Sequence, residues 1–411
     1  MKKYFKSEFF ILCGAICFMA LISLSFNNRN ASSINIQTKF PPDSIKVDSL
    51  QLSITHESQA IIKYYENKSK IENLSDELAN INNDIKIKDQ KLLDLNSSKI
   101  LAENSFNGDS TFDRIKKFIQ SLDLLYNQAE ICLTEKNKLI SSRTQKEKDL
   151  AAYYKQTELK PKYLKAVKEI QSHSLKILGS KQIVFHGSTY NIFVASLVSN
   201  EIRLHLKTLD SNNKYYNIGS VKTMLESHKL KPLMITNGGM YTPSNDPEGL
   251  YIEDYHKLFE IDTNKSHKPD PDNFYLMPNG VFYIDNKGKA HIDTTQEFAR
   301  KYSNEKIKEV RIATQSGPQL VINGRFNSAF NFPGTSKKTR SGVGVINDST
   351  VVFIISKNET TFYDFAIVFK DIFNCNNALF LDGAISLMYL HDIDNHVLGG
   401  NFGPMISVTK K

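Results

Sequence analysis

The strongest candidate for a catalytic group is an aspartate at the end of an apolar run. Asp382 directly follows the stretch Ala378–Leu381 and precedes Gly383. A carboxylate in this position is costly to bury unless it is paired or used. Strand ends that open into loops also often carry catalytic groups. The alternative is an aspartate that only caps a turn, but we predict Asp382 to be catalytic.

A second candidate is an arginine in the glycine-rich stretch Thr339–Gly344, which leads into the apolar pair Val345-Ile346. The Arg340 guanidinium, beside flexible glycines, has the planar form that contacts a phosphate at two points. The stretch lacks the third glycine of a dinucleotide-binding fingerprint and the lysine of a phosphate-binding loop. It therefore predicts contact with a phosphate group rather than with a nucleotide.

Two further stretches carry small and polar residues at apolar strand ends. Thr236–Tyr241 holds two glycines directly after Leu233–Ile235, and glycine permits close approach of a ligand to the backbone. Ala313–Pro318 holds hydroxyls and an amide, which suit a sugar or a phosphate. A tight turn alone would also explain the first stretch. Ser316 is not in a G-x-S-x-G elbow, so a hydrolase-type nucleophilic serine is not supported.

Two other groups of residues are weaker candidates. The stretch His391–His396 has metal-ligand residue types but no zinc-like spacing, and it fits a polar loop. Cys375 would need a nearby histidine to act as a nucleophile. Cys132 and Cys375 fall in different predicted domains, so we expect two free buried thiols. We predict no metal and no cofactor.

Long helices precede the part of the chain that holds these residues. Residues 1–26 combine three lysines with an apolar run, which is typical of a signal anchor or a cleaved signal peptide. The protein is then exported, either anchored in the membrane or secreted. Residues 27–50 read as a linker. Over residues 51–160, apolar positions recur at steps of three and four, which predicts an antiparallel helical hairpin with coiled-coil packing. The hairpin is either a spacer or a docking site for a partner.

The pattern of residue types along the sequence changes after residue 180. Lys160-Pro161 is expected to end the hairpin, and a connecting helix is predicted over residues 161–180. Residues 181–411 alternate β-branched and aromatic runs with turn-rich stretches, and helical patterns return only briefly. We therefore predict an α+β fold: a long helical hairpin followed by a compact α+β domain with a mixed or antiparallel sheet.

The net charge of +8 does not point to nucleic acid. Most of the excess lies in the helical half, where lysines and acids are interspersed along the predicted helices. A nucleic-acid site would gather basic residues and interleave them with aromatic ones. We therefore expect no nucleic-acid partner and interpret these charges as a solvated helix surface.

Six stretches in order make the C-terminal part of the chain similar to a known family. They are NGGMY, PEGLYIE, NFYLMPNGVFYID, ATQSGPQLVINGRFN, TRSGVGV and NALFLDGAISLMY. Together they resemble the phosphodiester glycosidase family, which includes a lysosomal enzyme that removes N-acetylglucosamine from a mannose-linked phosphodiester. The resemblance covers about residues 185–411 and does not include the helical hairpin.

The resemblance implies hydrolysis of a sugar 1-phosphodiester at the glycosidic carbon. It implies that Asp382 and Arg340 are catalytic, and it implies a substrate-binding set, with Gly383 among the matching positions. The predicted substrate-binding residues are Asn237, Gly238, Gln315, Ser316 and Ser386. Glu248 departs from the expected pattern and remains a candidate partner only. A phosphate-linked envelope glycan is the expected partner, and non-catalytic binding of such a polymer is the alternative function.

Overall fold

The computed structural model describes residues 44–105, 111–156, 158–208, 213–264, 273–330, 332–383 and 385–411. The predicted signal segment and most of the predicted linker lie outside these ranges. Among the residues described, none of the helices has both the length and the apolar content needed to cross a membrane. The chain divides into two compact units, and the second, Ile45–Lys411, contains the elements discussed below.

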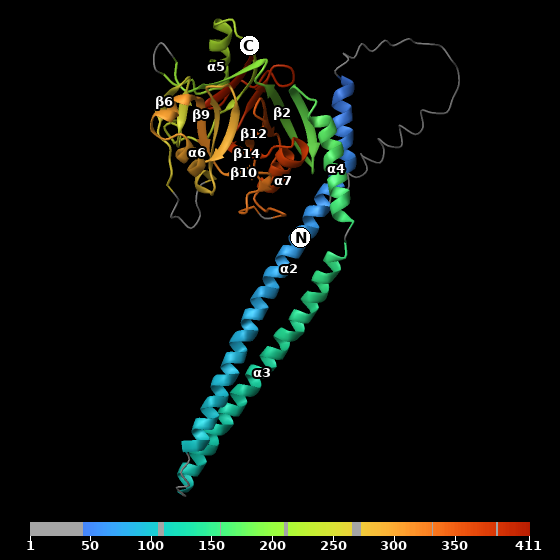
Figure 1. Cartoon of the computed structure of the whole chain (residues 1–411), viewed down its shortest axis with the longest axis vertical. Helices are drawn as coiled ribbons and strands as arrows, with labels where there is room; N and C mark the ends of the chain where they lie inside the picture. Colours follow the sequence, from blue (N-terminus) through green and yellow to red (C-terminus); the bar gives the residue numbers. More distant parts are fainter. Residues whose placement is uncertain are drawn as a thin grey trace, which may run out of the picture. The chain divides into compact units, whose positions relative to one another are not determined.

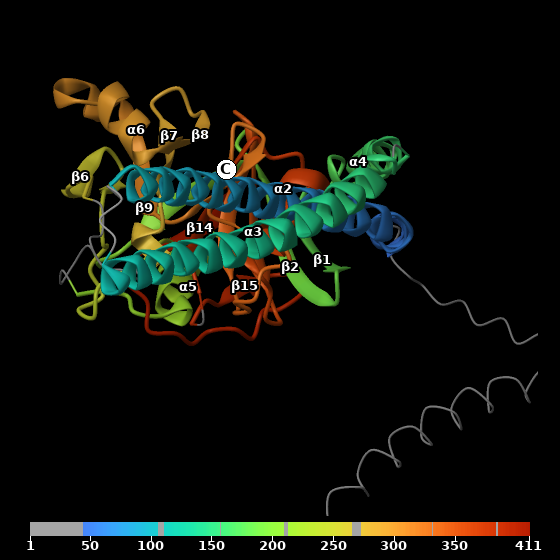
Figure 2. The same cartoon turned by 90° about the horizontal axis from the view of Figure 1, so that it is seen from below.

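Two long helices run antiparallel to each other, as the spacing of apolar residues predicts. Helix α2 spans Ser44–Ser105 and helix α3 spans Phe112–Tyr154. They lie side by side in both views (Figures 1 and 2). Ion pairs join them along their length: Glu77–Lys146, Lys88–Glu135 at 2.6 Å and Asp89–Lys136 at 2.5 Å.

The contact between these two helices is thin. Most apolar residues on the facing sides are only half-buried, and Ile85 and Cys132 are the fully buried ones in the central part of the pair. The predicted turn Asn107–Ser110 lies outside the described residues. The hairpin is therefore held by a narrow apolar seam and by charged side chains that cross it.

The connecting helix begins earlier than its proline suggests. Helix α4 spans Leu159–Ser174, and Pro161 lies in its first turn. A proline is tolerated there because the first backbone N–H groups of a helix have no acceptor within the helix. Pro161 therefore belongs to the start of the connecting helix α4, while α3 already ends at Tyr154.

Three antiparallel sheets form most of the chain after α4. The predicted α+β class is confirmed. The largest has the strand order β1-β2-β13-β12-β14-β10-β11. Its strands are β1 (Gly179–Phe185), β2 (Ser188–Ser196), β13 (Thr350–Ser356), β12 (Ser341–Asn347), β14 (Asn377–Asp382), β10 (Gln319–Ile322) and β11 (Arg325–Phe326).

Two smaller sheets pack against the largest one. The four-stranded sheet contains β15 (Met388–Leu390), β4 (Pro232–Asn237), β16 (Met405–Lys410) and β3 (Asn200–His205). The five-stranded sheet contains β6 (His256–Phe259), β5 (Tyr251–Glu253), β9 (Val310–Ser316), β7 (Gly280–Asp285) and β8 (Ala290–Thr294).

Short helices complete the domain, and three of them fall where helical patterns return in the sequence. They are α5 (Ile218–Ser227), α6 (Thr295–Lys301) and α7 (Phe362–Ile367), which runs into the π-helical turn η3 (Val368–Ile372). Two 3-10 turns are also present: η1 (Asn273–Tyr275) and η2 (Asn304–Glu309).

The central strands of the large sheet are buried on both faces, which explains their nearly unbroken apolar sequences. Along β13, Val352 and Ile354 face one core, while Val351 and Phe353 face the other. The second core lies between the large sheet and the two smaller ones. The first core lies between the large sheet and a layer of helices made of α2, α4, α7 and η3.

The base of the helical hairpin is part of that first core. Leu50, Ile54 and Ile61 of α2 are at most 1% exposed and pack in the same cluster as Phe380 of β14. A buried polar group joins the same elements. Asp371 of η3 accepts hydrogen bonds from the hydroxyls of Tyr65 (2.8 Å) and Tyr163 (2.9 Å).

Candidate active site

The predicted site residues lie at the ends of strands that belong to different sheets. Strand β4 ends at Asn237, β9 ends at Ser316 and β14 ends at Asp382. Strand β12 begins at Ser341, directly opposite Asp382 in the register of the large sheet, and a register shift follows at that point. The chain therefore brings the end of β4 close to β12 and β14, although Asn237 is more than 100 residues from Ser341 and Asp382 in sequence.

A serine that sequence reasoning did not single out is the centre of this group. Ser341 Oγ accepts a hydrogen bond from Asn237 Nδ2 at 2.9 Å and lies 3.0 Å from Ser386 Oγ. The same hydroxyl donates to the backbone oxygen of Asp382 at 3.2 Å. All three side chains are at most 5% exposed. The predicted residues Asn237, Ser386 and Asp382 are thus linked through Ser341.

The surroundings of Asp382 disfavour the charged form of its carboxylate. Its Oδ1 accepts the backbone N–H of Gly383 at 2.6 Å. Its Oδ2 is buried and has no hydrogen-bond partner in the described part of the chain. Burial raises the pKa of Asp382 to about 6, and the Gly383 N–H only partly offsets this rise. A carboxylate with a free oxygen and a raised pKa is common at sites of acid–base or nucleophilic chemistry.

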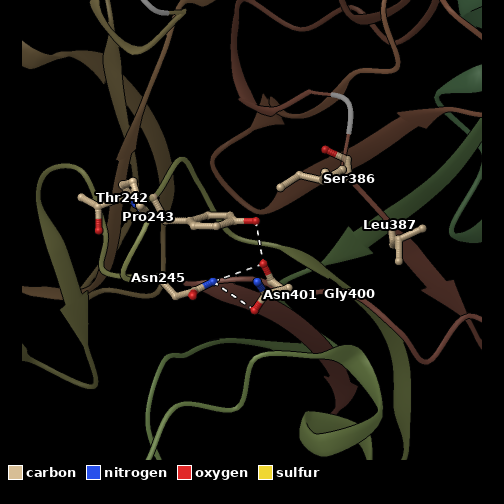
Figure 3. Close-up of a pocket in the computed structure, with 9 residues that line it drawn as sticks. Thr242, Pro243, Asn245, Ser386, Leu387, Gly400 and Asn401 are labelled. Carbon is tan, nitrogen blue, oxygen red and sulfur yellow. Dashed lines mark hydrogen bonds between the residues drawn. The ribbon is translucent and has the colours of Figure 1, made fainter.

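A cavity of about 450 Å³ lies beside these residues. Its walls come from three loops: Tyr241–Asn245 after β4, Ile385–Leu387 after β14, and Gly400–Asn401 before β16. Figure 3 shows Asn245 and Asn401 joined by hydrogen bonds, with Ser386 lying apart from them on a different loop. This volume is within the range of small-molecule sites in proteins.

Tyr241 lines the cavity and is influenced electrostatically by Asp382. Its hydroxyl donates to the backbone oxygen of Asn401 at 2.7 Å. Burial raises the pKa of Tyr241 to about 12, and the negative charge of Asp382 adds to the rise. The Asp382 carboxylate is therefore close enough to act electrostatically on a residue that lines the cavity.

Glycines allow the loops to come this close. Gly239 has a φ of 147°, and a Cβ there would lie 2.7 Å from Thr314 Oγ1. That hydroxyl donates to the backbone oxygen of Gly238 at 2.7 Å. A Cβ on Gly403 would lie 2.7 Å from both Asn245 O and Tyr241 Cβ. The predicted residue Gly238 thus contributes backbone at the point where β4 enters the site.

Gln315 and Ser316 are engaged with the protein itself. Gln315 Oε1 accepts from the N–H groups of Leu250 (3.0 Å) and Asp262 (2.9 Å), and its Nε2 donates to Asp262 O and Thr295 Oγ1. Ser316 Oγ donates to Leu381 O at 3.0 Å. Both residues are at most 2% exposed. Gln315 holds neighbouring segments together, and Ser316 fixes the end of β14 beside Asp382.

The structure does not bring the Arg340 guanidinium to this group. Its Nε and Nη2 donate to the backbone oxygens of Thr360 and Ser336, both at 2.9 Å, and its plane lies 3.5 Å from the centre of the Phe362 ring. Arg340 is 1% exposed. Burial lowers its pKa to about 10, so the group stays charged at neutral pH. Arg340 lies just before β12, and its guanidinium packs over the rings of Phe362 and Phe380, whereas Ser341 at the start of the strand contacts the site residues.

The sequence did carry a signal for two of the residues that were missed. Tyr241 ends the NGGMY stretch, and Asn401 lies in the run Gly399–Pro404, where three glycines precede a proline. Such a run marks a loop with an unusual backbone. By contrast, nothing distinguishes Ser341 from other serines until the strand register is known.

The remaining candidates lie outside the site. Cys132 and Cys375 are free and buried, as predicted, and burial raises the pKa of the Cys375 thiol well above its usual value. A nucleophilic thiolate requires the opposite shift. Within the described ranges, no three His, Cys, Asp or Glu side chains are grouped so as to hold a metal ion.

Comparison with protein families finds one family that part of this domain resembles. Residues 231–405, somewhat less than half of the chain, match the model of the family described as "Phosphodiester glycosidase". This segment is therefore similar in sequence to the phosphodiester glycosidase family. All the strand ends described above lie within the match, and the helical hairpin lies outside it.

Two individual proteins are each similar to a part of the chain. "Uncharacterized protein YigE" from Escherichia coli (strain K12) is 38% identical over 159 residues, which is 38% of this chain and 58% of that protein. The chain thus spans less than two thirds of that relative. A solved structure of the zebrafish N-acetylglucosamine-1-phosphodiester alpha-N-acetylglucosaminidase catalytic domain, auto-inhibited by its pro-peptide, is 13% identical. It has a TM-score of 0.40 and covers 56% of this chain and 82% of that one.

Proposed function

We propose that the domain after the helical hairpin hydrolyses the glycosidic C–O bond of a sugar 1-phosphodiester in an exported, phosphate-linked glycan. The observation that carries the proposal is the buried Oδ2 of Asp382, which has no hydrogen-bond partner among the described residues. The backbone of Asp382 is linked through the Ser341 hydroxyl to Ser386, which lines a cavity of about 450 Å³. The family match supports hydrolysis of a phosphodiester-linked sugar.

The proposed reaction breaks the bond between the anomeric carbon and the phosphate oxygen. Water supplies the new hydroxyl of the sugar, and its second proton balances the phosphomonoester that leaves. A phosphate is already a good leaving group, so the main task is to stabilise the positive charge that develops on the sugar. The Asp382 carboxylate performs this task, as nucleophile or as base toward water.

The cavity walls fit a neutral sugar better than a highly charged group. The polar residues that line the cavity are Thr242, Asn245, Ser386 and Asn401, together with the hydroxyl of Tyr241. Hydroxyls and amides both donate and accept hydrogen bonds, as sugar hydroxyls require. A phosphodiester carries a single negative charge, which amide and backbone N–H groups can bind. The contacts of Arg340 favour a positioning role for it, because its guanidinium fixes the segment that enters Ser341.

Location outside the cytoplasm is part of the proposal. It is supported by the N-terminal sequence, in which Lys2, Lys3 and Lys6 precede an apolar run. Protease added to intact cells should digest the domain if it is displayed outside. Protection until the cells are broken would contradict this part of the proposal without affecting the chemistry.

An isotope experiment tests the reaction. The purified protein is incubated with a sugar 1-phosphodiester in ¹⁸O-water, and we expect the label on the anomeric hydroxyl of the sugar. Label on the phosphate would indicate cleavage of the P–O bond and would overturn the proposal. Asp382→Asn should lower turnover by a factor of about 10² to 10⁴. The matched change Asp293→Asn, on β8 and outside the cavity, should leave it unchanged. Retention of polymer without release of sugar would favour the alternative, a non-catalytic binder.

A further inference from the structure

The hydroxyl groups that line the cavity differ in how the protein holds them. Three lining residues carry a hydroxyl: Tyr241, Thr242 and Ser386. Tyr241 donates to a backbone oxygen of the loop before β16 at 2.7 Å, and Thr242 Oγ1 lies 2.8 Å from Ser244 Oγ. Ser386 Oγ contacts the hydroxyl of Ser341 at 3.0 Å, and either oxygen of that pair can be the donor. The direction of the Ser386 hydroxyl therefore depends on Ser341.

The partners of Ser341 leave one hydrogen bond of variable direction. A serine hydroxyl has one hydrogen and two lone pairs. The Asn237 amide nitrogen can only donate to it, at 2.9 Å, and the backbone oxygen of Asp382 can only accept from it, at 3.2 Å. Ser386 Oγ can do either. Because Ser341 has a single hydrogen, Asp382 O and Ser386 Oγ compete for it.

The surroundings keep this competition within the protein. Ser341, Asn237 and Ser386 are at most 5% exposed, so bulk water does not replace their contacts. The Asn237 amide is held in one orientation, because the Thr236 hydroxyl lies 3.2 Å from its Oδ1 and can donate only to the oxygen. Asn237 Nδ2 therefore always faces Ser341 as a donor, and the choice left to Ser341 is where its own hydrogen points.

Two arrangements satisfy this geometry. In the first, Ser341 donates to Asp382 O, and Ser386 donates to Ser341 and presents only lone pairs to the cavity. In the second, Ser341 donates to Ser386, and the Ser386 hydrogen is free to point into the cavity. The second gives up the contact with Asp382 O, which is the longest of the three. Once a ligand accepts from Ser386, both contain the same number of hydrogen bonds, so a ligand can select the second.

The phosphate of the proposed substrate requires the second arrangement. Phosphate oxygens accept hydrogen bonds, and negative charge develops on them as the C–O bond breaks. Among the described residues that line the cavity, none is a lysine, an arginine or a histidine. The charge must then be met by N–H and O–H donors, as in an oxyanion hole. The Ser386 N–H donates to Gly383 O at 2.9 Å, so Ser386 lies on the same turn as the catalytic candidate Asp382.

We propose that Ser341 is a positioning residue for the Ser386 hydroxyl: it donates to Ser386 Oγ and so turns the Ser386 hydrogen toward the phosphate of the bound substrate. This inference rests on the proposed function and deepens it, because it assigns the group that stabilises the departing phosphate. As charge builds on the phosphate, the bond from Ser386 strengthens, and the bond from Ser341 to Ser386 strengthens with it. Ser341 itself does not touch the substrate.

A double-mutant cycle tests this assignment. Ser386→Ala removes the donor and should lower kcat on a sugar 1-phosphodiester about 10²-fold, with little change in KM. Ser341→Ala removes the group that turns this hydroxyl and should lower kcat about tenfold. The double variant should be no slower than Ser386→Ala, because Ser341 acts through Ser386. The control is Ser407→Ala on β16, a buried serine 2.8 Å from His205 Nε2, which should leave kcat unchanged.

Losses that multiply, with a double variant about 10³-fold slower than the wild type, would overturn the inference. So would a shifted pH inflection of kcat/KM in Ser341→Ala, since Ser341 would then act on the Asp382 carboxylate. A slow Ser407→Ala would also overturn it, because any buried serine would then have the same effect. If Ser341→Ala does not fold, Ser341→Cys takes its place in the cycle, since a thiol is a weaker donor.

Phosphate binding separates this inference from the proposed function. If the wild type hydrolyses sugar 1-phosphodiesters but the losses multiply, the positioning role fails and the function stands. If it shows no turnover, the same variants are titrated with inorganic phosphate by calorimetry. A loss of affinity of about tenfold in Ser386→Ala, and no further loss in the double variant, would then support the positioning role without the function. Equal affinities, or no binding by the wild type, would overturn both.

Discussion

Replacing Asp382 by asparagine should change the pH dependence of stability in a calculable way. The carboxyl titrates near 3.8 in the unfolded chain and near 6 in the folded protein, because burial disfavours its charged form. This difference, at about 1.4 kcal/mol per pH unit, amounts to about 3 kcal/mol. The folded pKa is the higher one, so the stabilising contribution is complete below pH 3.8 and is lost as the pH rises through 6.

The assay is urea unfolding of the wild type and of Asp382→Asn at several values between pH 4 and pH 8. The amide does not titrate, so the unfolding free energy of the wild type should fall relative to that of the variant by about 3 kcal/mol across this range. The comparison depends only on the slope, since any fixed cost of the amide is the same at every pH. Parallel curves would refute the reasoning and would mean that the carboxylate is solvated or paired.

The same titration should appear in the kinetics. If the ionised carboxylate is needed, kcat/KM of the wild type rises about tenfold per pH unit below pH 6 and levels off above it. The variant should lose turnover by a factor of about 10² to 10⁴ without this inflection. A residue with a purely structural role would move the stability curve and leave the inflection in place.

Three other changes follow from the contacts. Arg340→Met should lower the unfolding free energy by about 1 to 3 kcal/mol, because the buried carbonyl oxygen of Thr360 and the part-buried one of Ser336 lose their donor. Differential scanning calorimetry measures this against Arg325→Met on the exposed edge strand. Asp371→Asn should cost about 3 kcal/mol in urea unfolding, since two buried tyrosine hydroxyls and the Lys370 ammonium depend on that carboxylate; an unchanged midpoint would contradict this. Gly239→Ala should lower kcat, because the new Cβ meets Thr314 Oγ1 and shifts the loop after β4. Circular dichroism should show nearly unchanged helix content, since the change is local.

Much of the fold could be predicted from local patterns. The period of three and four in α2 and α3 depends only on neighbouring residues, and the alternation along β13 reflects burial on two faces. The start of α4 was less accessible, because Pro161 can end one helix or begin another. The packing of Leu50 and Ile54 beneath the large sheet could not be inferred, since it depends on which side of the seam meets the sheet.

At the site, too, some features could be predicted from local sequence and others depend on contacts between distant segments. Asp382 could be selected because an acid at the end of an apolar strand is unusual by itself. The role of Arg340 depends on which way its side chain turns just before β12 begins, and the sequence around it does not fix that direction. Ser341 gains its importance only from the register that places it opposite Asp382. Spacing along the chain thus identifies the strand ends, while the direction of each side chain requires the sheet.

The bond between Tyr65 and Asp371 has a consequence for how the chain folds. These residues are 306 positions apart, and their helices belong to one core. Contacts between such distant segments close large loops, and proteins rich in them fold slowly. During synthesis, Leu50, Ile54 and Ile61 emerge long before the strands that cover them. Until the sheet has formed, these side chains remain an exposed apolar surface, and such surfaces favour aggregation of a partly folded chain.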